Sequence, residues 1–391
     1  MSSPPSNCRR LATCTVAAVL LQILGLSLFV IGFFPVKPTL SGLSGAESYR
    51  QPTSPGSVED GRILAPDQRR SLYREMSEIP PQFDRLVIMV VDGLPAEFVL
   101  GKGNKPPTKA FAESMPYTQF LLSNGRAVGY HAKAAPPTVT MPRLKAMVSG
   151  AIGGYLDVAF NFNTQALLED NLVDQFYNIG WTMVMLGDET WIKLFPGLFT
   201  RYDGVSSFYV KDTVEVDHNV TRHLDDELLS NDWNLLVMRN PKKSSENPYA
   251  HNSLQILNTN ILMVPKLKEM DDIIKLIHKS AILHQDKTGS RTLLLVVSDH
   301  GMTDNGNHGG SSYEETDSLA LFIGLKAGCP NYTAATQNSA LQVDIAPTIA
   351  LLFGVPIPKN SIGILLSEVK GSLTGGCHVL YGNGRPFWTG E

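Results

Sequence analysis

The stretch from Val296 to Gly310, VVSDHGMTDNGNHGG, places Asp299, His300 and His308 within ten residues, directly after an apolar run. A buried carboxylate is costly unless it is paired or bound to a metal. Carboxylate oxygen and imidazole nitrogen together suit zinc or a similar divalent ion. The pattern therefore predicts a metal site here, whose remaining ligands must come from elsewhere in the chain.

Asp92 ends a second apolar run, RLVIMVVDG, which begins at Arg85. Taken alone, such a carboxylate is more often a cap on a strand-to-loop turn than a ligand. In a parallel sheet, however, ligands bind beyond the carboxyl ends of the strands. We therefore predict that Asp92 and Asp299 face the same ligand.

Two threonines precede a predicted helix in the segment APPTVTMPRLKAMVSG, which runs from Ala135 to Gly150. The prolines favour an extended approach, with Thr138 and Thr140 at the turn. A hydroxyl at this place lies near the positive end of the helix dipole, where a phosphate could be received. The alternative is that either threonine only caps the helix.

A further polar group, GDETW, follows another strand end. We predict that Asp188, Glu189 and Trp191 line a substrate cleft. The competing interpretation is a helix start, where acidic residues favour the dipole.

Continuous apolar runs of strand length recur at 85–93, 181–189, 233–238, 291–301 and 319–326. Amphipathic stretches with helical spacing lie between them, at 168–179, 215–229 and 265–284. Strands that alternate with helices indicate an α/β fold with a mostly parallel sheet and helices on both faces.

The N-terminus predicts a membrane anchor, because residues 11–34 carry no charge and are long enough to cross a bilayer. A signal-peptide core is usually shorter. Arg9 and Arg10 place residues 1–10 in the cytosol and the rest of the chain in the lumen. Residues 35–81, rich in proline, serine and glycine, are predicted to be a flexible linker.

Composition adds few constraints. The 391 residues have a formal net charge of -4, so nothing favours nucleic acid as a partner. Asn219 and Asn331 begin sequons, and both could be glycosylated if the domain is lumenal. Cys329 and Cys377 are the cysteines after the anchor, and a single disulfide between them is possible.

The motifs VDG, PTVT, SDHGM and NHGG, in this order, resemble the alkaline phosphatase superfamily. Longer stretches, including VTMPRLKAMVSG, NFNTQALLEDNLVDQ, GDETWIKLFP and GVPIPKNSIG, are similar to the GPI ethanolamine phosphate transferases, most of all to their type 2 members. The resemblance implies an alkaline phosphatase-like catalytic domain over residues 82–373, in the lumen of the endoplasmic reticulum and held to its membrane.

The resemblance also implies roles for individual residues. Asp92, Asp299 and His300 would hold one metal ion, zinc by analogy, with Thr138 as its fourth ligand and as the nucleophile. Thr138 would take phosphoethanolamine from phosphatidylethanolamine and pass it to a mannose of the GPI precursor, by analogy the second. The family further implies a second metal ion and a small multi-span stabilising subunit.

The chain departs from the family pattern at residues 239–261. The second ion would need His308 together with an Asp and a His from a D-x-x-G-H motif, which the chain lacks. His251 is the one imidazole in the atypical block, and we do not expect it to replace both ligands. The resemblance also implies a bundle of membrane helices after the catalytic domain, whereas residues 374–391 are an atypical glycine-rich tail.

Three functions remain open at this point. The leading one is a metal-dependent phosphoethanolamine transferase. The second is a catalytically impaired or inactive form that only binds a partner or a glycolipid. The third is a metal-dependent phosphodiesterase or nucleotide pyrophosphatase, which shares the VDG, PTVT and SDHGM motifs.

Overall fold

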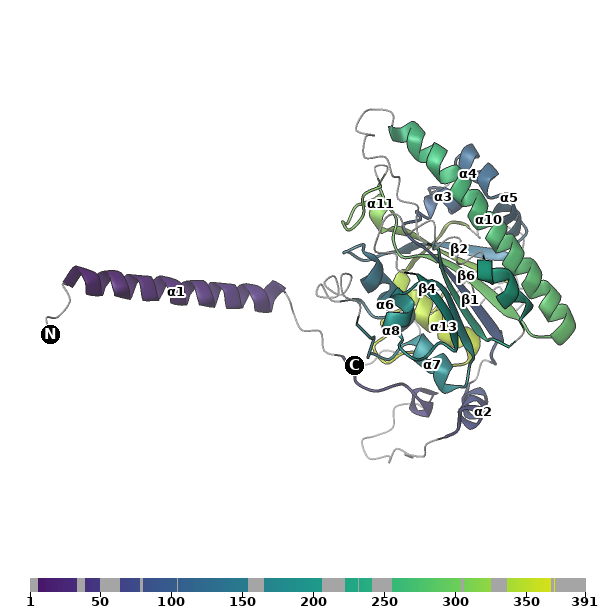
Figure 1. Cartoon of the computed structure of the whole chain (residues 1–391), viewed down its shortest axis with the longest axis horizontal. Coiled ribbons are helices and arrows are strands. Elements are labelled where there is room, and N and C mark those ends of the chain that lie inside the picture. Colours follow the sequence, from purple (N-terminus) through teal and green to yellow (C-terminus); the bar gives the residue numbers. More distant parts are fainter. Residues whose placement is uncertain are drawn as a thin grey trace, which may run out of the picture.

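The computed structural model describes residues 6–33, 39–49, 64–77, 80–103, 105–153, 165–205, 222–230, 232–240, 255–303, 306–324, 336–366 and 369. Helix α1 (Ser6–Phe33) stands apart from the α/β domain (Figure 1), and its apolar side chains are exposed. Within the described residues, its segment Arg9–Gly32 is the one helix long and apolar enough to cross a membrane. This fits the anchor predicted for residues 11–34.

An eight-stranded sheet organises the domain, in the order β4-β3-β5-β1-β6-β7-β2-β8. Five neighbouring pairs are parallel, whereas β7 is antiparallel to both of its neighbours, β6 and β2. The strands are β1 (Arg85–Val91), β2 (Ala127–Lys133), β3 (Met183–Asp188), β4 (Arg201–Val205), β5 (Leu235–Asn240), β6 (Thr292–Ser298), β7 (Asp317–Ile323) and β8 (Asn338–Leu341). The predicted mostly parallel sheet is confirmed.

The central strands are continuous apolar runs because both faces of the sheet are covered. In β1, Leu86, Ile88 and Val90 belong to one buried cluster, and the alternate residues Val87 and Met89 belong to another. The same alternation along β5 and β6 divides the core into two layers. Each layer is closed by its own set of helices.

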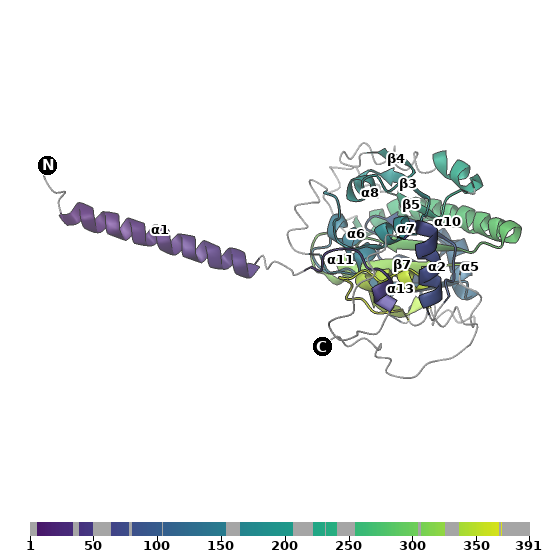
Figure 2. The ribbon, with the colours of Figure 1, turned by 90° about the horizontal axis from the view of Figure 1, so that it is seen from below.

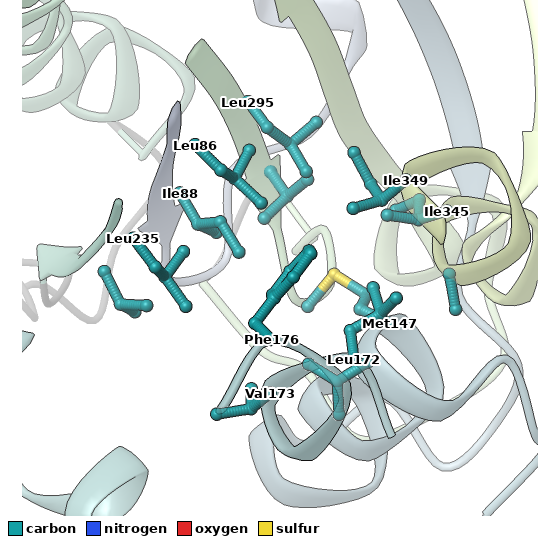
Figure 3. Packing of buried hydrophobic residues seen from close by; sticks show 14 of the residues in the cluster. Leu86, Ile88, Met147, Leu172, Val173, Phe176, Leu235, Leu295, Ile345 and Ile349 are labelled. Atoms are coloured by element: carbon teal, nitrogen blue, oxygen red, sulfur yellow. The ribbon is translucent and has the colours of Figure 1, made fainter. Parts of the chain in front are cut away.

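The helices of the first layer are α2 (Pro66–Met76), α6 (Thr140–Ser149), α7 (Leu172–Asn178), α8 (Thr190–Leu194) and α13 (Ile345–Phe353). Those of the second are α3 (Glu97–Leu100), α4 (Lys109–Ser114), α5 (Pro116–Ser123) and α10 (Gln255–Thr288). Figures 1 and 2 show the two sets on opposite sides of the sheet. Figure 3 shows the first layer, where Met147 and Phe176 meet Leu86, Ile88 and Leu295 of the sheet.

The predicted elements match this fold with local differences. All five predicted strands are present, but β2, β4 and β8 were not predicted from the sequence. Helix α10 begins at Gln255, ten residues before the helix predicted at 265–284. The described part of the atypical block 239–261 is therefore regular structure, namely the end of β5 and the first turns of α10.

Two parts of the predicted flexible linker are ordered on the domain. Residues 39–49, which we call the strap, end in the short helix η1 (Ala46–Tyr49). Ser44 of the strap is buried, and its Oγ and main-chain N lie 2.6 and 3.0 Å from Asp170 Oδ2. Helix α2 buries Tyr73 against the first layer. Such isolated contacts leave no periodic pattern in the sequence. The composition of residues 35–81 therefore predicted a flexible linker where these two parts pack on the domain.

Candidate metal centre

The carboxyl ends of four neighbouring strands form the floor of the site. The parallel register pairs Val91 of β1 with Ser298 of β6, so Asp92 and Asp299 follow side by side. On the other side of β1, Val90 pairs with Arg239 of β5. Asp188 ends β3, the next strand. Sheet order thus brings together four charged residues that are far apart in the sequence.

Asp92, Asp299 and His300 offer ligand atoms that all lie within 4.8 Å of one another. His300 Nε2 lies 3.6 Å from Asp299 Oδ2 and 3.8 Å from Asp92 Oδ1. Two ligands of a tetrahedral zinc ion, each about 2.0–2.1 Å from the metal, lie roughly 3.4 Å apart. The spacing of this group therefore fits one divalent ion.

Two atoms of the group are buried without a hydrogen-bond partner, namely Asp299 Oδ2 and His300 Nε2. The other polar atom of each of these two side chains has a main-chain hydrogen-bond partner. Asp299 Oδ1 accepts from the main-chain N of Gly93 at 3.0 Å and of His300 at 2.9 Å. His300 Nδ1 lies 2.8 Å from the carbonyl oxygen of Gly301, which only accepts, so the neutral ring carries its proton there. The lone pair of Nε2 then faces the metal position, as in metal-binding histidines.

Gln342 braces the loop that carries these ligands. It lies in the short helix η4 (Gln342–Asp344), at the start of α13. Its Nε2 lies 3.1 Å from the Ser298 carbonyl, 2.7 Å from the Asp299 carbonyl and 2.9 Å from Ser318 Oγ. A buried amide in this place holds the main chain on both sides of the Asp299 ligand. Its role was not predicted, because nothing in its local sequence marks it.

Thr138 is fully buried at the start of the turn that leads into α6. Its Oγ1 donates to the Gly310 carbonyl at 3.0 Å and accepts from Gly309 N at 2.9 Å. His308 joins this turn to the metal group, because its ring stacks on His300 with centroids 4.4 Å apart. Its Nδ1 lies 3.4 Å from the Thr138 carbonyl. The structure thus links Thr138 and His308 to the metal group.

The loop that holds Thr138 is itself held by a capping box in α11 (Tyr313–Thr316). Glu315 Oε1 accepts from Gly310 N at 3.0 Å, and Oε2 accepts from Ser312 N at 3.1 Å. These main-chain hydrogen bonds also keep the pKa of Glu315 below its usual value, so it stays ionised. The ionised Glu315 carboxylate therefore holds the loop at Gly310 and Ser312 that contacts Thr138.

The three residues of GDETW have different environments. Asp188 is buried at the centre, where its Oδ2 lies 2.7 Å from Arg239 Nη1. Glu189 is an outer residue that pairs with Lys193 one turn along α8. Trp191 differs from the prediction, because its ring is buried in the first layer against Phe195. The first turn of α8 carries Trp191 away from the strand end.

Arg239 is a second site residue that the sequence did not reveal. Its side chain is 6% exposed and forms ion pairs with Asp92 and Asp188. Its Nη2 also lies 3.5 Å from Thr140 Oγ1, at the start of α6. The available signal was its position at the end of β5, where the family motif would begin. The ion pairs of Arg239 with Asp92 and Asp188 could not be derived without the strand order.

Arg239 governs the charge of Asp92. Burial alone would raise the pKa of Asp92, but the positive charge of the Arg239 guanidinium and its hydrogen bond hold that pKa below its usual value. Conversely, burial would lower the pKa of Arg239, and the carboxylates of Asp188, Asp92 and Asp299 raise it instead. Both groups are therefore charged across the physiological range of pH.

Several predicted features lie outside the described residues. They are the two sequon asparagines, the alternative imidazole in the atypical block and the two cysteines after the anchor: Asn219, Asn331, His251, Cys329 and Cys377.

Solved structures with the same fold include sulfatases. The chain superposes on a putative sulfatase from Bacteroides thetaiotaomicron with a TM-score of 0.53, at 14% identity and over 76% of each chain. It superposes on a 2-O GAG sulfatase with a TM-score of 0.51, also at 14% identity, over 75% of this chain and 74% of that one. These similarities show the alkaline phosphatase-like fold and not the activity.

No family model matches the chain. Curated relatives do. The Homo sapiens protein named GPI ethanolamine phosphate transferase 2, catalytic subunit, is 38% identical over 361 residues, which make up 92% of this chain and 34% of that protein. GPI ethanolamine phosphate transferase 2 of Aspergillus fumigatus is 37% identical over 370 residues, 90% of this chain and 42% of the relative. By sequence, nine tenths of the chain therefore match GPI ethanolamine phosphate transferases, and the chain spans about a third to two fifths of the length of these relatives.

Proposed function

We propose that the protein transfers phosphoethanolamine from phosphatidylethanolamine to a mannose of a GPI anchor precursor, the second mannose being the acceptor. The observation that carries the proposal is the Asp92, Asp299 and His300 group, to which His308 connects the main chain of Thr138. The relatives that share nine tenths of this chain are named for phosphoethanolamine transfer to GPI.

In this reaction Thr138 Oγ1 forms a bond to phosphorus, and the bond from phosphorus to the diacylglycerol oxygen breaks. The proton of the threonine hydroxyl leaves with diacylglycerol. A mannose hydroxyl then attacks the phosphothreonine, and its proton returns to Thr138. A divalent ion, zinc in our proposal, would be held by Asp92, Asp299 and His300 and would stabilise the alkoxide and the phosphoryl oxygens.

The residues around Thr138 determine whether it can react. In the structure its hydroxyl donates to Gly310 and accepts from Gly309, so it must rotate away from this loop to reach phosphorus. Gly309, with a φ of +105°, and Gly310 form the loop that would have to release it. The Glu315 cap keeps that loop in place while the hydroxyl turns.

We further propose that α1 anchors the chain in the membrane of the endoplasmic reticulum with the α/β domain in the lumen, where Asn219 and Asn331 would be glycosylated. The apolar helix and the naming of the relatives for GPI support this location. A small multi-span subunit would stabilise the assembly. Protease protection of the domain in sealed microsomes tests the orientation, and a domain digested from outside would overturn it.

The experiment for the activity is covalent labelling. The full chain in detergent, supplied with zinc and with phosphatidylethanolamine labelled in its ethanolamine, should retain label on a threonine. A GPI precursor with an unmodified second mannose should then remove the label and carry it. Absence of protein-bound label would contradict the proposal.

A second candidate function is that of a binding protein without transfer. It is favoured by the complete burial of Thr138, whose hydroxyl has both partners in the loop. In that case the glycolipid binds but no label appears on the chain. Hydrolysis of a nitrophenyl phosphodiester without any acceptor would instead favour a phosphodiesterase.

A further inference from the structure

Arg239 is a buried cation between two carboxylates at the ends of the central strands. Its Nη2 lies 2.9 Å from Asp92 Oδ2, and its Nη1 lies 2.7 Å from Asp188 Oδ2. The side chains of Arg239 and Asp188 are 6% and 1% exposed, so salt screens this attraction little. Arginine keeps its charge in such a place, and its planar group holds both carboxylates at once.

Asp92 uses its two oxygens in different directions. Its Oδ1 belongs to the metal group, 3.8 Å from His300 Nε2, whereas its Oδ2 faces the guanidinium. A carboxylate between two metal ions would divide its oxygens in the same way. The guanidinium therefore stands on the side of Asp92 where a second cation would have to lie.

The charge balance of the centre favours one metal ion. Asp92, Asp188 and Asp299 supply three negative charges among the described residues. The guanidinium and one divalent ion supply three positive charges, which balance them. A second divalent ion would leave an excess of two positive charges in a buried site, and uncompensated buried charge is strongly unfavourable.

We propose that Arg239 takes the place of a second metal ion, so that this centre binds a single divalent ion and uses the guanidinium as its second positive charge. The guanidinium supplies that charge beside Thr140 at the start of α6. This inference rests on the metal centre of the proposed function. It is independent of the transfer reaction, because it concerns ion stoichiometry and stability, which can be measured without any substrate.

The test measures bound zinc and thermal unfolding of the full chain in detergent. The native chain should bind one zinc ion per chain. Arg239→Gln leaves Asp92 and Asp188 without their counter-charge, so the Tm of the metal-free protein should fall by about 10 °C. Added zinc should restore part of this loss. Arg239→Lys keeps the charge but loses the planar contact. It should bind one zinc ion, and its Tm should lie between those of the native chain and Arg239→Gln.

Arg201→Gln is the matched control, because it makes the same change at an outer ion pair. Arg201 contacts Glu227 and Asp232 and is 37% exposed. Solvent weakens this more exposed pair, so the Tm of Arg201→Gln should fall by less than half as much as that of Arg239→Gln. Two zinc ions per native chain would overturn the proposal. So would an Arg239→Gln protein with the Tm and the zinc response of the Arg201→Gln control.

A second inference rests on an independent observation, an apolar surface beside the strap. Six large aliphatic side chains there are 40–64% exposed: Leu40, Leu43, Ile152, Ile357, Ile362 and Ile364. We call these residues the strap surface. Hydrogen bonds connect its parts, because Leu40 and Asn360 exchange two, of 2.8 and 3.1 Å. Ile362 N also donates to the Gly150 carbonyl at 2.9 Å, two residues before Ile152.

Chain length places the strap surface close to the end of α1. Helix α1 ends at Phe33, and the described strap begins at Thr39. Six residues of fully extended chain span at most about 20–22 Å. The strap is held to the domain at both Asn360 and Asp170, so its N-terminal end is fixed on this surface.

We infer that the strap surface lies on the lipid bilayer that holds α1. Exposed aliphatic side chains at this distance from a membrane helix would enter the interfacial region, where burial of apolar area is favourable. The domain would then have a defined orientation on the membrane, and it would not move freely on a linker.

Tryptophan quenching by brominated lipids tests this orientation in the full chain. The chain is reconstituted in vesicles of phosphatidylcholine and phosphatidylethanolamine, with plain or brominated acyl chains. Ile362→Trp should add emission that brominated lipid removes. Leu283→Trp, at a 61% exposed position on α10 of the second layer, should add emission that is not quenched. Equal quenching at both positions would overturn the inference, and so would a blue shift at position 362 without quenching, which would indicate a second protein copy.

Discussion

At the scale of single residues, the centre depends on two side chains in which one buried polar atom lacks a hydrogen-bond partner. Asp299 Oδ2 and His300 Nε2 are buried and face one another without a hydrogen bond. Buried polar atoms are rarely left in this state in the absence of a ligand. The other polar side-chain atom of each residue has a partner, so within these two residues the missing partner lies at the proposed metal position.

The two threonines of PTVT provide the sharpest test of the nucleophile. Thr138→Ala should abolish covalent labelling by the phosphoethanolamine donor, because its oxygen is the proposed site of attachment. Thr140→Ala, the matched control two residues away, removes a hydroxyl that lies 3.5 Å from Arg239 and should leave labelling within about tenfold of native. Mass spectrometry of the labelled peptide measures both. Label retained in Thr138→Ala and lost in Thr140→Ala would reverse the assignment.

Gly301, directly after the His300 ligand, has no room for a side chain. A Cβ there would lie 2.1 Å from the Glu314 carbonyl oxygen and 2.6 Å from that of Asp317. Main chain cannot yield as a side chain does, so Gly301→Ala should destabilise the protein by about 1–3 kcal/mol and displace His300. Chelator competition should show weaker zinc binding.

Gly204→Ala is the control for this change. Its added methyl would meet the terminal carbon of Ile192, at the flexible end of a side chain, far from the metal ligands in the sheet order. Unaltered zinc affinity is expected for Gly204→Ala. Zinc affinity that is also unaltered in Gly301→Ala would contradict the argument from close packing.

At the scale of elements, adjacent strand ends and short helices share the task of positioning. The proposed metal ligands follow β1 and β6, the guanidinium belongs to β5 and Asp188 ends β3. The α6 turn brings Thr138, and α11 maintains the loop around it. A substitution that shifts the main chain of any of these elements should therefore change zinc affinity.

Gln342 permits a test of this positioning, because it touches the ligand loop and not the metal group. Gln342→Ala removes the hydrogen bonds to the Ser298 and Asp299 carbonyls. Residues that orient metal ligands typically contribute 10–100-fold to affinity, so zinc should bind about tenfold more weakly. Stability should fall by about 1–3 kcal/mol.

Gln342→Glu is the informative companion, because it keeps the length of the side chain but supplies no donor when ionised. It should weaken zinc binding at least as much as Gln342→Ala. Full zinc affinity in both variants would mean that the loop holds its shape without the amide.

At the scale of the whole molecule, the second layer adds a dependence on pH that is remote from the metal. His278 of α10 is buried, and its Nδ1 lies 2.9 Å from the Tyr117 hydroxyl. Burial, assisted by Arg126, lowers the pKa of His278 below 6.5 in the folded protein. The unfolded chain then takes up the proton first as the pH falls. The contribution of His278 to the free energy of unfolding is therefore complete above about pH 6.5, and it is lost as the pH falls through the folded pKa of His278.

Unfolding of the metal-free chain by denaturant, measured from pH 8 to pH 5, should show this decline. His278→Gln removes the titrating group and should flatten the curve in that window. The lowered pKa of Asp92 has the same sign at more acidic pH, because its stabilisation is present above about pH 4 and is lost below it. A slope between pH 8 and pH 5 that His278→Gln does not change would contradict the assignment.

Much of the fold could be predicted because its signals are local. A strand buried on both faces must be apolar at every position, so β1 and β6 are evident as continuous runs. The shorter edge strands β4 and β8 have mixed compositions and were missed. The strap and α2 were missed for a related reason, since each is held by a few buried contacts that follow no period.

By itself, the sequence determined which residues could hold a metal. Asp92, Asp299 and His300 follow apolar runs directly, and the end of such a run is a local property of the chain. Only the tertiary structure decided what stands beside them. Whether Arg239 is solvated or held between Asp92 and Asp188 depends on the order and register of β3, β5 and β1. Those depend on contacts between residues about 50 positions apart for β3 and β5 and about 150 positions apart for β1 and β5, which no local pattern records.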